Sequence, residues 1–390
     1  MVAIFTYHNN QEKWPESQAI AYSTDKGRTW KKHTVNPVLK NPGITDFRDP
    51  KVFWDDKTGS WLMALAAGDV IQFYSSPDLL NWTLMSDFGR GRGNHIGPWE
   101  CPDLFPVKVA GSNEIKWVLL VSVVDLTQGI DRLATATQYF IGDFDGRQFT
   151  STKQDTLWLD HGKDNYAGNT FNNVPDKRRI FTGWMQSHQY GGAVQQLITK
   201  TWAGAATFPR EITITKTGNI YRLRQNPVTE LASLYGNALK LRHIKVNDTY
   251  PLLSKVNAEK APLDIQLEFN NSHPPEQYGL RLKNSNGEYI EMIYDSKAGQ
   301  FIVDRTKATS AKIHNRYASI QKISYKSAGN SMHWRLLIDV ASVELFAADG
   351  EVVFTNTVYP SIPFDQLELF SKNGPIELKK GMVYQLKSGE

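Results

Sequence analysis

The chain has 390 residues, of which 41% are hydrophobic and 22% are charged, and its formal net charge is +4. This balance is that of a folded globular protein and argues against extensive disorder. The length allows two or three ordinary domains, and the single cysteine, Cys101, excludes an internal disulfide.

Two classes of partner are disfavoured by the charge and hydropathy patterns. No long run of Lys and Arg occurs, so we expect no nucleic acid partner. The longest apolar run, residues 117–124, is far shorter than the roughly 20 residues needed to cross a bilayer. We therefore expect no membrane partner either.

The chain opens in a strand-like segment, residues 1–7, without the basic, apolar and cleavage regions of a signal peptide. A fold that begins in mid-strand fits a chain whose beginning is missing. We expect an N-terminal truncation, and the localisation stays open at this point.

Short β-rich segments separated by Gly, Asp, Asn and Pro recur through the first half, and helical periodicity is scarce. A loose repeat links residues 21–30, 73–82 and 140–149. In the first two copies a strand ends in a Ser/Asp turn and a Trp opens the next strand. Copies at intervals of roughly 50–70 residues are typical of propeller blades. The Ser and Asp of each turn are interpreted as caps for backbone N–H groups, a structural role.

Two strings carry carboxylates beside groups that bind sugars. The first is Phe47-Arg48-Asp49-Pro50, in which Pro50 is expected to keep Asp49 extended and to fix the direction of its side chain. The second is Trp99-Glu100-Cys101-Pro102-Asp103-Leu104-Phe105.

Glu100 is the candidate acid/base of a glycosidase. It must be protonated at the working pH to donate to a leaving oxygen, and Trp99 supplies an apolar side while Asp49 supplies a nearby charge. Cleavage with retention requires two carboxylates about 5–5.5 Å apart. Residues from different blades converge at the channel of a propeller, so carboxylates distant in sequence can meet there.

Three further segments follow in the first half. They are Asp160-His161-Gly162-Lys163-Asp164-Asn165-Tyr166-Ala167, the strand-like Arg179-Ile-Phe-Thr-Gly-Trp184-Met185, and Trp202 to Glu211. A charged loop is the structural alternative for the first of them.

A change of composition near Pro227 predicts a domain boundary near residue 228, giving domains 1–228 and 229–390. Beyond it, apolar and polar residues alternate with turns about every 8–12 residues, which predicts an antiparallel β-sandwich. The expected strands are 263–269, 278–282, 289–294, 300–303, 333–338, 343–346 and 351–354.

Together these strings resemble glycoside hydrolase family 32, the invertase, inulinase and levanase family. The resemblance implies an all-β chain, a five-bladed β-propeller whose first blade is largely missing, followed by a C-terminal β-sandwich. It implies retaining hydrolysis of β-fructofuranosides such as sucrose, inulin or levan. The partner is then a fructose-containing oligo- or polysaccharide, with no metal and no organic cofactor, and the location is extracellular if the chain follows the family.

The resemblance also implies roles for particular residues. Glu100 is the acid/base, and Asp49 hydrogen-bonds sugar hydroxyls and stabilises the transition state. The implied substrate-binding residues are Arg48, Cys101, Asp160, Lys163, Tyr166 and Trp184.

The chain departs from the family in three places. The signature Trp-Met-Asn-Asp-Pro-Asn-Gly, which carries the nucleophile, is absent, so we expect this chain to be nearly inert. Gln186-Ser187-His188 stands where Ser-Asn-Trp is usual, and His161 where an aromatic residue is usual. Asp46 and Asp103 lie near the two strings, but nothing in the sequence places either at the anomeric carbon.

Two alternatives remain open. One is a non-catalytic fructan-binding or partner-binding protein derived from the family, and a weaker one is a sialidase-type propeller suggested by the Ser/Asp turns. A propeller that lacks a blade exposes strand edges. It is therefore expected to be poorly soluble, to form a dimer through the open edge, or to rearrange into a four-bladed ring.

Overall fold

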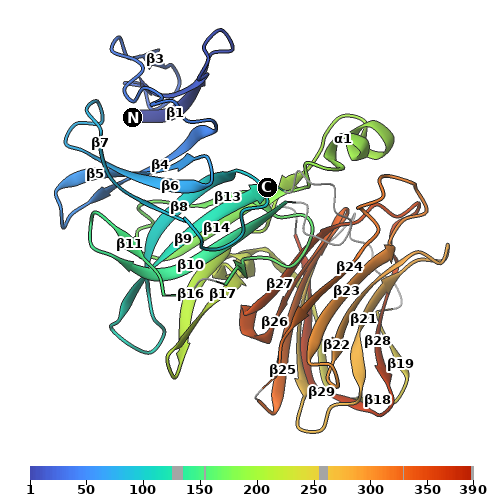
Figure 1. Ribbon diagram of the computed structural model, residues 1–390. Coiled ribbons are helices and arrows are strands. Elements are labelled where there is room, and N and C mark those ends of the chain that lie inside the picture. Colours follow the sequence, from blue (N-terminus) through green and yellow to red (C-terminus); the bar gives the residue numbers. More distant parts are fainter. Residues whose placement is uncertain (125–134, 153–154, 254–261, 328, 388–390) are drawn as a thin grey trace.

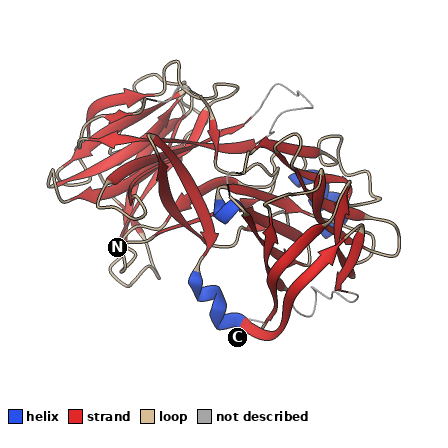
Figure 2. Ribbon diagram, turned by 90° about the horizontal axis from the view of Figure 1, so that it is seen from below, coloured by secondary structure: helices blue, strands red, loops and turns tan. Residues whose placement is uncertain are grey.

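The computed structural model describes residues 1–124, 135–152, 155–253, 262–327 and 329–387. The fold is all-β, as predicted, and Figure 2 shows how few and short the helices are. Among the described residues, no helix is long and apolar enough to cross a membrane.

Residues up to Pro227 form four antiparallel sheets in the described part of the chain. The first contains β1 (Val2–His8), β2 (Glu16–Tyr22) and β3 (Lys31–Lys32), and the second contains β4 (Phe47–Asp55), β5 (Ser60–Ala67), β6 (Val70–Ser76) and β7 (Thr83–Phe88). The third contains β8 (Trp99–Lys108), β9 (Ile115–Val124), β10 (Thr135–Phe144), β11 (Phe149–Thr150) and β12 (Leu157–Trp158). The fourth contains β13 (Tyr166–Thr170), β14 (Arg179–Met185), β15 (Ala205–Ala206), β16 (Arg210–Thr217) and β17 (Ile220–Pro227). The total of five blades stays a prediction.

Consecutive sheets pack face to face through apolar side chains, because strand residues alternate between the two faces of a sheet. Met63 and Leu65 of β5 face the first sheet beside Ile4, whereas Leu62 faces the third sheet beside Trp99. A further cluster that includes Phe105 and Phe181 joins the third and fourth sheets. This packing also brings the edge strands of three sheets together, because β4 and β13 both contact β8.

The repeated Ser/Asp turns have the predicted structural role. Ser23 Oγ donates to Asp25 Oδ1 at 2.7 Å, and Asp25 accepts the Thr29 backbone N–H. Ser76 and Asp78 repeat the first of these contacts in the second sheet. Hydrogen bonds from Thr29 and Ser23 lower the pKa of Asp25 to about 2, and hydrogen bonds mainly from Asn81 lower that of Asp78 to about 2.

The second half is a sandwich of two six-stranded sheets around one core that contains Leu267, Leu280, Met292 and Trp334. One sheet has the order β18 (Tyr235–Val246), β29 (Ile376–Leu386), β20 (Leu263–Asn270), β25 (Ser331–Asp339), β26 (Ser342–Ala347), β27 (Val352–Thr357). The other has the order β19 (Thr249–Leu253), β28 (Gln366–Lys372), β21 (Gln277–Lys283), β22 (Tyr289–Asp295), β23 (Gln300–Lys307), β24 (Ile320–Ser324). The predicted β-sandwich is confirmed.

Short helical turns occupy the connections. They are α1 (Gly191–Val194), η1 (Gln195–Thr199), η2 (Thr229–Leu234) and η3 (Ala348–Gly350). The predicted boundary at residue 228 lies between β17 and η2. Figure 1 shows the two parts side by side.

Buried arginines join the two parts. Arg210 of β16, fully buried, donates to Glu344 of β26 at 2.6 Å. In the second contact the arginine belongs to the sandwich and the carboxylate to the propeller side: Arg305 of β23 pairs with Asp164, on the connection before β13. We call these four residues the arginine exchange.

Candidate active site

The site begins with three β-bulges at corresponding positions in three sheets. In each of β4, β8 and β13 two residues stand opposite one residue of the neighbouring strand. The first residue of each pair has a left-handed backbone: Asp49 with φ 63°, Cys101 with φ 48° and Ala167 with φ 52°. This is the arrangement of a bulge that usually has glycine at that position.

The expectation that Pro50 keeps Asp49 extended is wrong. Asp49 adopts the left-handed region although it precedes a proline. Its backbone N–H donates to Thr6 Oγ1 of β1 at 3.0 Å, a contact that helps to offset the strain.

The residue immediately before each bulge belongs to one cluster. Arg48 Nη2 donates to Glu100 Oε1 at 2.9 Å, and the Tyr166 hydroxyl donates to Glu100 Oε2. Arg48, Glu100 and Tyr166 therefore meet although 118 positions separate the first from the last. The prediction that residues from different sheets converge is confirmed for these three.

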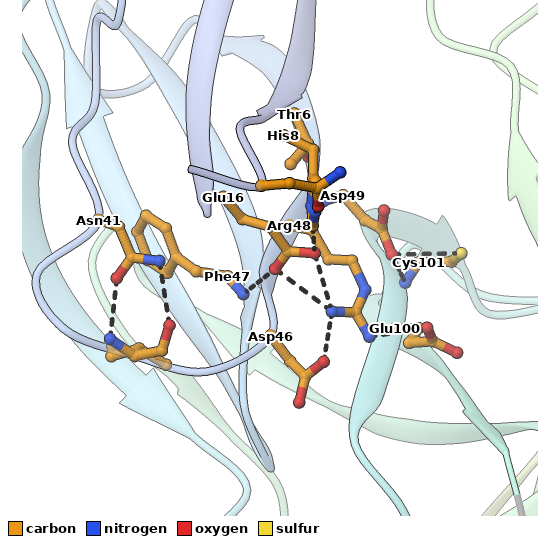
Figure 3. Close-up of polar contacts among 12 residues, drawn as sticks. Thr6, His8, Glu16, Asn41, Asp46, Phe47, Arg48, Asp49, Glu100 and Cys101 are labelled. Carbon is orange, nitrogen blue, oxygen red and sulfur yellow. Dashed lines mark hydrogen bonds and ion pairs between the residues drawn. The ribbon is translucent and has the colours of Figure 1, made fainter. Parts of the chain in front are cut away.

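Arg48 is surrounded by carboxylates, as Figure 3 shows. Its Nη1 donates to Asp46 Oδ1 at 2.5 Å and to Glu16 Oε1 at 3.2 Å. Burial lowers the pKa of the Arg48 guanidinium, but the hydrogen bonds to Asp46 and Glu100 outweigh burial and raise the pKa above its ordinary value. The guanidinium is thus a permanent cation beside Glu100.

Asp49 lies on the other side of the cluster. Its Oδ2 accepts the Cys101 backbone N–H at 2.9 Å and the Cys101 thiol at 3.6 Å. Burial raises the pKa of Asp49, and the Cys101 N–H and the charge of Arg48 oppose this rise only in part. Burial also raises the pKa of the Cys101 thiol, which stays a neutral donor.

Aromatic rings border the cluster on the side of the fourth sheet. Trp184 stands opposite Tyr166 in the β13–β14 register. The exposed His188 ring lies edge-on to both, with ring centroids 5.1 Å from Tyr166 and 5.0 Å from Trp184. Position 188 therefore presents a ring beside the cluster, although the sequence departs from the expected Trp there.

Asp160 lies outside this cluster. It is buried between the two parts of the chain, where it accepts hydrogen bonds from Arg210 at 2.9 Å and from the Thr355 hydroxyl at 2.6 Å. Burial raises the pKa of Asp160, but the charge of Arg210 and the Thr355 hydroxyl outweigh burial and lower it overall. Those two hydrogen bonds end on Oδ2, and Oδ1 accepts the Gly162 and Thr355 backbone N–H groups. This location does not fit the predicted contact with a sugar, because both carboxylate oxygens are already occupied by protein donors.

Lys163 lies on the connection that precedes Tyr166 of β13. Its side chain is buried and lines a cavity of about 440 Å³ between the third sheet and the sandwich.

Neither carboxylate considered as a replacement nucleophile is available in the cluster. Asp46 is paired with Arg48, and Asp103 is fully buried, where it accepts the Thr170 N–H at 2.6 Å and lies 3.5 Å from Lys51 Nζ. The described residues contain no group of three or more His, Cys, Asp and Glu side chains placed to hold a metal ion.

The sequence missed Glu16, which the structure places here, and it marked His188 only as a departure from the family. Glu16 of β2 accepts the Phe47 N–H at 2.6 Å in addition to its contact with Arg48. No local motif marks it, since its importance arises from a residue 32 positions away. Chemically, the arrangement offers one carboxyl group held by a cation and a phenol, and a second, desolvated carboxyl beside it.

Comparison with known proteins gives consistent results over nearly the whole chain. The family model described as "Glycosyl hydrolases family 32 N-terminal domain" matches residues 1–227. The model described as "Glycosyl hydrolases family 32 C terminal" matches residues 230–385.

Individual relatives agree. A levanase of Bacillus subtilis is 34% identical over 99% of this chain and 57% of its own length. A levanase of Bacillus sp. is 32% identical over 99% of this chain and 43% of its own length, so this chain spans about half of these two relatives. An extracellular exo-inulinase of Meyerozyma guilliermondii is 31% identical over 99% of this chain and 76% of its own length.

Solved structures show the same fold. The exo-inulinase of Aspergillus awamori superimposes with a TM-score of 0.86 at 26% identity, covering 99% of this chain and 79% of that one. A β-fructofuranosidase of Schwanniomyces occidentalis, complexed with fructosyl-erythritol, has a TM-score of 0.84 at 26% identity, covering 99% of this chain and 78% of that one.

Proposed function

Because the chain belongs to glycosyl hydrolase family 32, we propose that it acts on β-fructofuranosides: the fructans levan and inulin, or sucrose. The observation that carries this proposal is Glu100 held between Arg48 and Tyr166 at the meeting point of three sheets. Each oxygen of the Glu100 carboxyl accepts one of these hydrogen bonds, so the orientation of the carboxyl is fixed. The relatives named as levanases and exo-inulinases support the substrate class.

We propose that Glu100 is the acid/base. In a retaining reaction it donates its proton to the leaving oxygen, and in the second step it takes a proton from the attacking water. Tyr166 and Arg48 act as positioning residues for this carboxyl. Asp49, aligned by the Cys101 N–H, hydrogen-bonds the fructose hydroxyls and stabilises the positive charge that develops on the ring.

The residues proposed to bind the sugar around these two carboxyls lie in or beside the cluster. They are Arg48, Cys101, Tyr166 and Trp184. Lys163 is proposed to bind sugar farther from the cleaved bond. We assign Asp160 a structural role instead, because its oxygens hold Arg210 and Thr355.

The attacking carboxylate is a separate matter. No Trp-Met-Asn-Asp-Pro-Asn-Gly string occurs in the 390 residues, and Asp46 and Asp103 are both engaged elsewhere. We propose that the chain as it stands binds fructosides but turns them over very slowly. The alternative, a fructan-binding protein without catalysis, rests on the same observation.

The test is release of fructose from sucrose, inulin and levan by the purified chain, with Glu100→Gln as the control. We expect little release by either protein, and we expect release to appear when a segment bearing the missing string precedes residue 1. Turnover by the chain alone that Glu100→Gln abolishes would show that another group attacks. Binding of fructose without turnover in any form would favour the binding protein.

Three further proposals follow from the architecture. The domains are 1–228 and 229–390, and the free edge of β1 pairs with a second copy in a dimer. The chain works outside the cell, as the names of its exo-inulinase relatives state for them.

A further inference from the structure

A groove of about 680 Å³ lies on the outer face of the sandwich sheet that begins with β18. Its volume is within the range of small-molecule sites. Figure 1 shows β18, β25 and β29 far from β4, which carries Asp49, so the groove is separate from the candidate active site. We call it the outer groove, and the polar side chains that define it are Lys240 and Arg242 of β18, Lys380 of β29, Gln266 and Glu268 of β20, and His333 and Arg335 of β25.

Two cations of the outer groove stand directly opposite each other. Arg242 and Lys380 are partners in the β18–β29 register, and like charges in that position destabilise an antiparallel pair. Lys380 is compensated by Glu268, whose Oε2 lies 3.1 Å from its Nζ. Arg242 and Lys240, both exposed, make no ion pair with any residue that the structure describes. This end of the groove therefore has a positive charge that a bound anion would compensate.

A phosphate group suits this end. Lys240 and Arg242 are two positions apart on one strand, so their side chains lie on the same face of the sheet. A phosphate monoester has about two negative charges near pH 7, and the guanidinium fork binds two phosphate oxygens at once. The second acid of the lining, Asp349, pairs with His333 of β25 at 2.9 Å, and two strands separate β25 from β18.

The other end of the outer groove offers a hydrogen-bond acceptor beside a donor. Gln266 and Arg335 are partners in the β20–β25 register. Gln266 Nε2 donates to the Tyr235 hydroxyl at 3.1 Å, and Arg335 donates to Asp264 through Nε at 3.0 Å and Nη2 at 2.8 Å. Among the described residues, Gln266 Oε1 accepts no hydrogen bond and Arg335 Nη1 donates none. A hydroxyl group both donates and accepts, so it can bind the two atoms together.

We propose that the outer groove binds a phosphorylated sugar or polyol. The phosphate lies at Lys240 and Arg242, and the hydroxyl groups lie at Gln266 and Arg335. Met382 of β29 is the register partner of Lys240 on one side and of Gln266 on the other, so it offers apolar surface to the carbon skeleton between the two ends. The site contains no residue of the candidate active site and does not depend on the proposed function.

The test is calorimetric titration of the full chain with glucose 6-phosphate, glucose and inorganic phosphate. Glucose carries no fructosyl group, so binding at the Glu100 cluster does not enter the comparison. We expect glucose 6-phosphate to bind at least tenfold more tightly than either of the other two. Arg242→Ala should weaken binding of the ester at least fivefold, and Gln266→Leu should reduce the affinity for the ester to that for inorganic phosphate.

Lys245→Ala, on an exposed residue of β18 outside the groove lining, is the matched control and should leave all affinities unchanged. Equal affinity for glucose 6-phosphate and inorganic phosphate in the unmodified chain would overturn the proposal. So would binding of the ester that Arg242→Ala leaves intact, or no binding of the ester at all.

The same chemistry occurs in polymers of polyols joined by phosphodiesters, so poly(glycerol phosphate) is titrated in parallel. A diester has one negative charge where a monoester has about two, and two cations line this end of the groove. We therefore expect the polymer to bind more weakly per phosphate than glucose 6-phosphate does. Tighter binding of the polymer would overturn the assignment to a free ester.

Discussion

Asp49 combines a left-handed backbone with a desolvated carboxylate. Both features are unfavourable in the folded chain, and the Cys101 N–H holds one of the Asp49 oxygens at the cluster. Strain and desolvation of this kind are typical of functional positions. At the scale of single residues, the cluster therefore has a cost in stability that a substitution can reveal.

Replacing Asp49 by Asn should stabilise the fold at neutral pH. The folded-state pKa of Asp49 is raised above its ordinary value of 3.8, so its stability contribution is fully present below pH 3.8 and is lost as the pH rises through the folded pKa. Asn does not ionise, so Asp49→Asn should raise the free energy of unfolding at pH 7 by about 0.5–2 kcal/mol. The gain should vanish below pH 3.8. Urea unfolding at several pH values measures both.

Asp46→Asn is the matched control, because that change weakens an ion pair with Arg48 and should lower stability at pH 7. A less stable Asp49→Asn protein at pH 7 would contradict the assignment of burial as the dominant effect on this carboxyl.

Local motifs were enough to single out Arg48, Asp49, Glu100, Tyr166 and Trp184, which the structure brings close together, and their roles stay a prediction. Glu16 was missed, since a contact with a residue far along the chain leaves no local pattern. Asp160 shows the opposite failure. Its string resembles a pocket motif, but its side chain is directed into the domain junction, and only the position of β27 reveals this.

At the scale of elements, the three bulges explain why the motifs contain Asp-Pro, Cys-Pro and Ala-Gly. Each bulge needs a left-handed residue, and the next residue must allow the strand to re-enter its sheet. Gly168 follows Ala167, and a Cβ at Gly168 would lie 2.1 Å from Phe181 Cζ. The sequence predicted the strands from their alternation but not the bulges, because an Asp-Pro pair before a β-run also fits an ordinary turn.

Ala167→Gly should stabilise the protein. A left-handed backbone costs a non-glycine residue about 1–2 kcal/mol, whereas the added freedom of glycine in the unfolded chain costs about 0.5–1 kcal/mol. The expected net gain is about 0.5–1 kcal/mol in urea unfolding. Ala66→Gly, in the ordinary strand β5, is the control and should destabilise. The same sign for both variants would show that the left-handed backbone at residue 167 carries no appreciable strain.

At the scale of the whole molecule, the arginine exchange joins the two β parts. Arg210 is fully buried and lies over the Phe346 ring, 5.0 Å from its centroid, while its two terminal nitrogens bind Asp160 and Glu344. The sandwich was predictable from strand alternation, and the arrangement of the first half was predicted from its repeated strand-turn segments. The exchange was not, because its partners are more than 100 residues apart.

Removing one partner of the exchange should be costly. Arg210→Met leaves Glu344 buried without its cation, so we expect a loss of about 3–5 kcal/mol, and a similar loss for Glu344→Gln. The double variant should lose less than the sum, because the two residues interact directly. Arg178→Ala breaks an exposed pair with Glu230 and should have a much smaller effect. Strict additivity of the first two changes would contradict a direct coupling.

Three successive residues of β27 are held from two sides. Thr355 and Thr357 are bound by Asp160 and Asp164 of the propeller side, while Asn356 between them receives the Gln321 amide. Two separated contacts fix an angle where a single contact would act as a pivot. The orientation of the sandwich relative to the propeller side is therefore set at β27 by contacts on both sides of this strand.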